Sequence, residues 1–414
     1  MDRAYRFLIF FAPLSPIYFL CYNICMTDMN ILKGLVHTII PEIVEIRHQL
    51  HQIPEIAFKE YKTSAKIREI LEPLGMEFLP SIFETDVTAV LDSGKPGKTI
   101  LLRSDIDALP IEEACSVLYR SLHPGFAHSC GHDGHMAILL GTAMVLSKMK
   151  EQINGKVRFL FQPGEESLAG AKSMVEAGYL QKEPVPDVAY ALHGWPGTEH
   201  GCIECCPGPI MASTDDFMIT LTGAGGHGAM PEKAVDLLAA AAGFILAMKE
   251  AVSWISAPYD PAVVSVCSVE GKGTFNVFAD RIILKGTSRY LKDSTGNKIK
   301  KTMVELLDKY ILPSGGKYEI VSPLPDYVSV NNDPELYSRA AEIAEKYLGR
   351  EKWNGNGICS MCGDDFGFIS RKIPSLYFRL GAGTEHASLH NPAYDFEDDT
   401  IENGILMMCG LVLG

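Results

Sequence analysis

The sequence lacks the cysteine density of a secreted disulfide scaffold. Its 414 residues include 11 cysteines, which is too dilute for such a scaffold, and the odd number leaves at least one of them unpaired. We therefore interpret most of the cysteines as buried thiols in a reducing compartment. The sequence also lacks internal repeats and low-complexity tracts. Its 47% hydrophobic and 21% charged residues exclude a disordered chain.

The sequence also has fewer basic than acidic residues. Lys and Arg number 37 against 51 Asp and Glu, a formal net charge of −14. Such a chain is a poor candidate for holding a phosphate backbone, so no nucleic-acid partner is expected. A local basic pocket for an anionic substrate is still compatible with this balance. The length favours about two or three domains.

Residues 1–29 are interpreted as an N-terminal extension. Two arginines precede an uncharged run over residues 7–26, which two prolines interrupt. Three interpretations stay open: an upstream artefact or disordered segment before a true start at Met26 or Met29, a signal segment, or a membrane anchor. No other stretch is long and apolar enough to span a membrane, so a membrane partner is not expected.

Strands alternate with helices along most of the remaining chain. This alternation predicts an α/β fold, with a catalytic sheet that carries helices on both faces. The strands of this sheet are expected at 87–91, 99–103, 157–162, 188–193 and 375–380. The helices are expected over 39–74 on either side of 52–55, and at 135–150 and 334–348.

A second unit interrupts this pattern. Its elements follow the order β-α-β-β-α-β, which is the order of a ferredoxin-like domain. They are expected at 217–222, 234–252, 263–269, 281–289, 293–311 and 317–321. We therefore predict an inserted domain at 211–322 between two parts of a catalytic domain, at 30–210 and 323–414.

Five stretches rich in polar residues adjoin predicted strands or helices, where α/β enzymes place their active sites. They are 103–110, 127–135, 161–166, 188–193 and 389–395. The densest is 127–135, whose three histidines and one cysteine are hard to explain as packing. Cys130 and His132 can face one ion if the chain is extended, and both ligand types suit zinc, cobalt, nickel or manganese. We interpret His128 and His135 as supporting or capping residues.

Glu165 and Glu166 are adjacent carboxylates, and both stay ionised only in a positive local field. A metal supplies such a field, and the natural division is one ligand and one general base. Taken alone, this turn, His193, the loop 103–110 and the stretch 389–395 are also compatible with structural or solvated roles. Together the five stretches supply one thiolate, three imidazoles and one or two carboxylates. That inventory fits two divalent ions that share a bridging water.

The motifs resemble those of the dinuclear metallo-amidohydrolases, the family that includes aminoacylase, hippurate hydrolase and auxin-conjugate hydrolases. The resemblance covers roughly residues 42–410, and the joint occurrence of its motifs in this order is highly specific. They are RHQLHQIPE (47–55), SDIDALP (104–110), CGHDGH (130–135), QPGEE (162–166), GGHGAMP (225–231) and LHNP (389–392). The family fold is a catalytic α/β domain with an inserted dimerisation domain, in agreement with the pattern above.

The resemblance implies that five side chains hold the two ions, with Cys130 as the bridge. These ligands are Cys130, His132, Glu166, His193 and His390. It further implies that Glu165 is the general base and that Asp107 is an orienting carboxylate behind the metal centre. Manganese, zinc, cobalt and nickel all stay open as the bound metal.

The inserted domain also contributes to the site in this family. His227 lies between glycines, which let the backbone approach closely and let the ring project. The resemblance implies a homodimer in which this histidine reaches the partner subunit's site and polarises the substrate carbonyl. The alternative is a loop histidine without a catalytic part. Asn276 and Arg289 match positions that hold the carboxylate and the amide region of the substrate.

Residues 362–366 depart from the family's Gly-x-Glu-Asp-Phe pattern. Asp364 stands where glutamate is usual, and its shorter side chain places whatever it holds differently. Cys359 and Cys362 are spaced like a redox or zinc pair. No second pair with suitable spacing accompanies them, so we interpret both as buried thiols. The same interpretation applies to Cys202, Cys205 and Cys206.

The expected activity is hydrolysis of the amide bond of an N-acyl amino acid of the hippurate, N-acetyl or aryl-acyl type. A dipeptidase or other exopeptidase with the same centre is one alternative. A non-catalytic binder is another, although a mere binder has no need of a general base at Glu165. Because a bridging thiolate is vulnerable to oxidation, we expect a cytoplasmic protein. The N-terminal run leaves a secreted or anchored form open.

Overall fold

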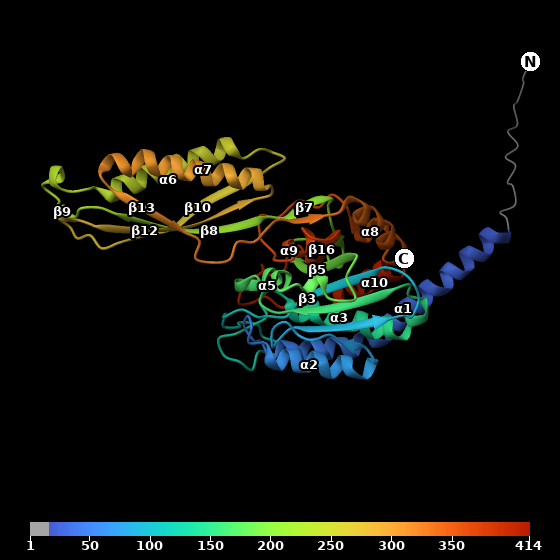
Figure 1. Ribbon diagram of the computed structural model, residues 1–414. Coiled ribbons are helices and arrows are strands. Elements are labelled where there is room, and N and C mark those ends of the chain that lie inside the picture. Colours follow the sequence, from blue (N-terminus) through green and yellow to red (C-terminus); the bar gives the residue numbers. More distant parts are fainter. Residues whose placement is uncertain (1–15) are drawn as a thin grey trace, which may run out of the picture.

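The computed structural model describes residues 16–414, in which a larger and a smaller sheet lie side by side (Figure 1), besides two two-stranded pairs. In this part of the chain the larger sheet has eight strands in the order β1-β2-β4-β3-β5-β16-β6-β15. They are β1 (Glu77–Phe78), β2 (Val87–Asp92), β3 (Thr99–Asp105), β4 (Lys156–Gln162), β5 (Val188–Pro196), β6 (Ile203–Glu204), β15 (Trp353–Asn354) and β16 (Ser375–Gly383). The central strands β4, β3, β5 and β16 are parallel.

Helices cover both faces of this sheet, as predicted. On β3, Ile100 and Leu102 point into one core, and Leu101 points into the other. This alternation is the period of two that a strand buried on both faces shows. The first core is covered by α1 (Pro16–His51), α2 (Tyr61–Leu71), α3 (His132–Lys148), α8 (Pro334–Tyr347) and α10 (Ile401–Leu413). The second is covered by α5 (Gly170–Glu176) and α9 (Gly367–Ser370).

Helix α1 starts well before the predicted helical stretch. Residues 16–29 of the predicted extension form its beginning, and residues 1–15 lie outside the described residues. Leu32 and Val36, further along α1, are fully buried in the first core. The helix is therefore part of the catalytic fold from at least Leu32 onward.

The smaller sheet is antiparallel, with the order β10-β12-β8-β13. Its elements are β8 (Ser213–Thr222), α6 (Leu237–Ile255), β10 (Ala262–Gly271), β12 (Arg281–Tyr290), α7 (Asp293–Tyr310) and β13 (Lys317–Val321). Both helices pack on one face of the sheet. The inserted β-α-β-β-α-β fold is therefore confirmed. A short pair, β9 (Gly226–His227) and β11 (Val277–Phe278), lies at the end remote from the larger sheet (Figure 1).

Helix α6 corrects one expectation. Among the described residues it is the one helix that is long and apolar enough to cross a membrane by length and composition. One face, which includes Phe244 and Met248, packs into the core of the inserted domain. The opposite face exposes 71% of Leu246 and 83% of Trp254. The sequence analysis assigned residues 234–252 to a helix of the inserted domain and did not count them as a run long enough to cross a membrane.

The chain enters and leaves the inserted domain at neighbouring points. Strand β7 (Gly208–Met211) on the way in pairs with β14 (Val330–Asn332) on the way out. A further bridge joins Thr214 to Tyr327. The β7–β14 pair and this bridge hold the inserted domain beside the carboxyl ends of the parallel strands.

Candidate metal centre

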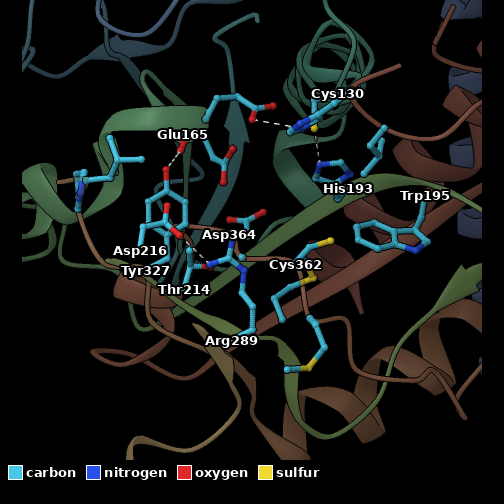
Figure 2. Close-up of a pocket in the computed structure, with 18 residues that line it drawn as sticks. Cys130, Glu165, His193, Trp195, Thr214, Asp216, Arg289, Tyr327, Cys362 and Asp364 are labelled. Carbon is cyan, nitrogen blue, oxygen red and sulfur yellow. Dashed lines mark hydrogen bonds and ion pairs between the residues drawn. The ribbon is translucent and has the colours of Figure 1, made fainter. Parts of the chain in front are cut away.

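A cavity of about 420 Å³ opens where the two domains meet (Figure 2). Its catalytic-domain wall carries Cys130, Glu165, Glu166, His193 and His390. Its inserted-domain wall carries Thr214, Asp216 and Arg289. Side chains that follow different strands of one parallel sheet meet at its carboxyl edge, which is the usual place for a site in this architecture.

The first two predicted ligands are separated by a left-handed glycine. Gly131 has φ 85°, and a Cβ there would lie 2.8 Å from the Tyr394 hydroxyl. The chain therefore turns between Cys130 and His132, and α3 begins at His132, three residues earlier than predicted. The chain is therefore not extended between Cys130 and His132, because Gly131 is left-handed and α3 begins at His132. The turn still brings ligand atoms of Cys130, His132 and His193 within 4.8 Å of one another.

Hydrogen bonds fix which nitrogen of each buried histidine faces the cluster. Nδ1 of His132 lies 2.8 Å from the carbonyl oxygen of Asp107, and Nδ1 of His193 lies 2.7 Å from that of Gly194. Because a carbonyl only accepts, each Nδ1 carries a proton, and Nε2 is the ring nitrogen left to face the cluster. Nε2 of His193 is 3.5 Å from the sulfur of Cys130. This is the arrangement in which imidazoles bind metals.

Glu166 joins a second group of donors to the first. Its Oε1 lies 3.7 Å from Nε2 of His132, and its Oε2 lies 3.3 Å from Nε2 of His390. Ligand atoms of Cys130, Glu166 and His390 also gather within 4.8 Å. Cys130 is thus common to both groups, as a ligand between two ions must be.

The electrostatics of the cluster favour added positive charge. Three of its buried polar atoms have no hydrogen-bond partner: Nε2 of His132, Oε1 of Glu166 and Oδ1 of Asp107. Burial lowers the pKa of His132, but the carboxylates of Asp105 and Asp107 outweigh it and raise that pKa to about 10. Burial and Glu166 raise the pKa of the Cys130 thiol well above its ordinary value. Unpaired ligand atoms among buried carboxylates fit divalent cations, and an ion bound there would displace the proton of the Cys130 thiol.

Glu165 lies at the edge of this cluster, with a carboxylate oxygen within 4.8 Å of ligand atoms of His132 and Glu166. Burial, followed by the carboxylates of Asp364 and Glu166, raises its pKa well above the ordinary value. Its Oε1 accepts from the backbone N–H of Asp365 at 3.4 Å, and its carbonyl accepts from the hydroxyl of Tyr327. A carboxylate held in place with a raised pKa is suited to take up a proton during a reaction.

Asp107 lies behind two of the ligands. Its carbonyl orients His132, and its Oδ2 accepts from the backbone N–H of Glu166 at 3.0 Å. The histidine that follows in α3, His135, uses both ring nitrogens elsewhere: Nδ1 lies 2.7 Å from Asp105, and Nε2 accepts from the N–H of Gly194. His135 therefore supports the site and has no nitrogen left for an ion.

Two supporting residues escaped the sequence reading. Arg103 is fully buried; it contacts Asp105 of its own strand at 2.8 Å and ties β3 to the loop after β15 through Asp365 at 2.7 Å. It is the first residue of the polar stretch 103–110, but an arginine in a predicted strand does not by itself indicate a supporting role in a metal site. Tyr327, which holds Glu165, follows the inserted domain and belongs to none of the motifs.

The loop at 359–366 differs partly from expectation. Asp364 lines the cavity, accepts from the N–H of Phe366 at 2.8 Å and lies 3.6 Å from Nη1 of Arg103. The interpretation of Cys359 and Cys362 as buried thiols was wrong: Cys359 is half-buried and Cys362 is exposed. The reason is that this loop follows the cavity edge (Figure 2). Cys206 is also half-buried, whereas Cys202 and Cys205 are buried.

The predicted residues of the inserted domain separate into two places. Arg289 lines the cavity, with Nη1 3.4 Å from Asp216 (Figure 2). His227 and Asn276 lie together at the remote end, where the N–H of Gly228 donates to the carbonyl of Asn276. His227 is exposed, and neither residue lines the cavity of its own chain. Within one chain, Arg289 lies in the same cavity as the metal donors, whereas His227 and Asn276 do not.

Known proteins with similar sequences and structures share this arrangement of domains. Residues 101–414 match the peptidase family M20/M25/M40. An N-acetylcysteine deacetylase of Bacillus subtilis is 34% identical, over 87% of this chain and 93% of that protein. Thermostable carboxypeptidase 2 of Saccharolobus solfataricus is 33% identical, over 91% and 95%. The crystal structure of a dinuclear metal-binding M20 peptidase of Bacillus subtilis superimposes with a TM-score of 0.80 at 30% identity, over 91% and 98%.

Proposed function

The chain belongs to the peptidase family M20/M25/M40, and from this premise we propose that it hydrolyses the amide bond of an N-acyl amino acid. The products are a carboxylic acid and an amino acid. The observation that carries the proposal is Glu165, a buried carboxyl with a raised pKa beside the gathered metal donors. A protein that only binds its ligand needs such donors but no proton acceptor beside them.

The cavity walls favour a substrate with one anionic and one apolar end. Arg289 supplies a cation for the carboxylate of the amino acid. Trp195, Met211 and Leu389 line the cavity with apolar surface, which suits an uncharged acyl group better than the charged amino terminus of a dipeptide. A carboxypeptidase relative keeps the exopeptidase reaction as the second candidate.

The five donor residues described above would hold two divalent cations. Such cations lower the pKa of a water molecule and polarise the carbonyl that is attacked. Glu165 accepts the proton of the attacking water and later delivers it to the leaving amine. Arg289 holds the substrate carboxylate, and Asp107 keeps His132 and Glu166 in their orientations.

Metal removal and a substrate panel test this proposal. Dialysis against a chelator is expected to abolish hydrolysis, and manganese, zinc, cobalt or nickel is expected to restore it to different extents. The restored enzyme is assayed on acetyl-, benzoyl- and indolyl-acyl amino acids beside dipeptides, with kcat/KM as the measure. Higher kcat/KM on dipeptides would favour the exopeptidase, and no turnover with any metal would favour a binder.

We propose that the protein is a homodimer through the inserted domain and that His227 acts in the partner's cavity. The exposed apolar face of α6 runs beside β10, which is an edge strand of the smaller sheet. An unpaired edge next to exposed Leu246 and Trp254 is the kind of surface that a second copy covers. In such a dimer, His227 and Asn276 would reach the cavity of the partner subunit, since they do not line the cavity of their own chain.

Loss of this face should separate the subunits and stop turnover. Leu246→Asp with Trp254→Asp is expected to give a monomer by light scattering, because both carboxylates would be buried in the interface. Leu312→Asp, at a 49% exposed leucine of the same domain, is the control and should stay dimeric. Mixing Glu165→Gln with His227→Ala subunits should recover about a quarter of the wild-type activity, because half of the dimers then hold one complete site. No recovery would contradict the action of His227 across subunits.

We also propose that the protein works in the cytoplasm. The cysteines whose side chains the structure describes are all free thiols. A buried thiolate in the metal site is best protected in a reducing compartment.

A further inference from the structure

Arg47 is a fully buried cation that takes no part in the steps above. It lies near the end of α1, within the RHQLHQIPE motif, and its side chain is 0% exposed. Its guanidinium faces three carboxylates. Nη1 lies 3.2 Å from Asp133 and 2.8 Å from Asp395, and Nε lies 2.7 Å from Asp398.

The carboxylates that Arg47 joins belong to the two segments that carry metal donors. Asp133 directly follows His132 in the first turn of α3. Asp395 and Asp398 follow His390 on the segment before α10. A single nitrogen, Nη1, contacts both Asp133 and Asp395. Arg47 thus spans the gap between the segment of Cys130 and His132 and the segment of His390.

Neighbouring side chains hold each end of this bridge. Asp133 is also contacted by Nδ1 of His51 at 2.8 Å, and Asp395 accepts from the hydroxyl of Tyr119 at 2.6 Å. The Tyr119 ring lies 4.6 Å from the Arg47 guanidinium. Each carboxylate is therefore oriented from two sides, which leaves the guanidinium one position to occupy.

The two segments also touch elsewhere: Phe396 packs against Gly134, with its ring centroid 5.9 Å from that of His135. The N–H of His390 donates to the carbonyl of Ser129 at 2.8 Å, and Tyr394 packs against Gly131. His390 itself is 53% exposed and has a left-handed backbone, φ 62°. Its ring is the least supported of the donors, so its position depends on how its segment is anchored.

We propose that Arg47 is a positioning residue of the metal centre, which sets the spacing of the His390 segment from the Cys130–His132 segment by bridging Asp133 and Asp395. The inference rests on the metal centre of the proposed function. Nη1 contacts Asp133 and Asp395 while Nε contacts Asp398, and the single ammonium of a lysine, a compact point charge, cannot hold all three carboxylates at this spacing. Groups that orient metal ligands from behind typically contribute tenfold to a hundredfold in metal affinity.

The experiment compares Arg47→Lys with Arg158→Lys. Arg158 is a matched control, because it is also fully buried in the catalytic domain and lies 4.4 Å from a tyrosine ring, that of Tyr179. Its guanidinium contacts only backbone carbonyls, at Tyr179, Lys182 and Pro184. Cobalt(II) is titrated into each metal-free protein in competition with a chelator, and the visible and thiolate charge-transfer bands are recorded.

Arg47→Lys is expected to weaken cobalt binding roughly tenfold to a hundredfold and to alter the visible spectrum, because the donors no longer meet at fixed distances. Arg158→Lys should lower the melting temperature yet leave cobalt affinity and spectrum as in the wild type. Equal affinity and spectrum in Arg47→Lys and the wild type would overturn the proposal. So would an equal loss of affinity in both variants, since that would be a general effect of destabilisation.

A second variant keeps the proposal testable if Arg47→Lys does not fold. Tyr119→Phe removes one hydroxyl and frees Asp395 from one side. It should weaken cobalt binding in the same direction, and unchanged affinity would count against the bridge. A wild type that binds no cobalt would instead refute the metal centre, so the two failures are distinguishable.

Discussion

Replacing Glu165 by glutamine is expected to lower kcat by about 10²–10⁴-fold, the usual contribution of a general base. The amide keeps the size of the side chain and an oxygen that can accept the N–H of Asp365. It cannot accept a proton from water at neutral pH. Steady-state kinetics on the best substrate of the panel, with metal content measured in parallel, give the result.

The metal content of this variant should equal that of the wild type, because the five donor residues are intact. Glu176→Gln is the matched control, since Glu176 is an exposed glutamate of α5 with no part in the cavity. It should leave kcat and KM unchanged. Turnover of Glu165→Gln at a near-normal rate would remove Glu165 from the mechanism, even if the metals were confirmed.

Replacing Cys130 by alanine is expected to have the largest effect on metal occupancy. Cys130 belongs to both groups of donors, so its loss disturbs both ions at once, whereas loss of His193 or His390 disturbs one group. Because a metal ion contributes several kcal/mol of transition-state stabilisation, kcat/KM should fall by at least about 10³-fold.

Atomic absorption on the purified variant gives the number of ions per chain. We expect fewer than two in Cys130→Ala after dialysis against metal-free buffer. Cys409→Ala is the control: Cys409 is also a fully buried free thiol, but it lies in α10 within the first core. It should lose some thermal stability and keep its metals. Full occupancy and activity in Cys130→Ala would show that no ion needs this sulfur.

The regular elements of the fold were largely predictable, since alternating or 3.6-residue hydrophobic periods are local signals. Strand β13 has the predicted bounds, and β12 and α7 end within a residue of theirs. Helix α10 was missed because it is apolar all round and therefore shows no polar face. The early start of α1 was missed because its first residues are as uncharged as a leader segment.

The candidate site was predictable as a set of residues, but not as a geometry. Spacing and family resemblance named the donors. The left-handed turn at Gly131 could not be read from a glycine that several conformations would accommodate. The contacts of Arg47 join residues 86 and 348 positions apart, and no local pattern encodes such pairs. The remote position of His227 depends on the path of the whole inserted domain.

The pairing of β7 with β14 suggests how the inserted domain could have entered an ancestral chain. Because these two strands are antiparallel neighbours in a sheet of their own, a short hairpin turn would suffice to join the two parts of the catalytic domain without the inserted domain. An ancestral chain could therefore acquire the insertion in one step and keep its original core, since the ends of the new segment already meet. The insertion thereby adds a basic side chain, Arg289, to the wall of the cavity.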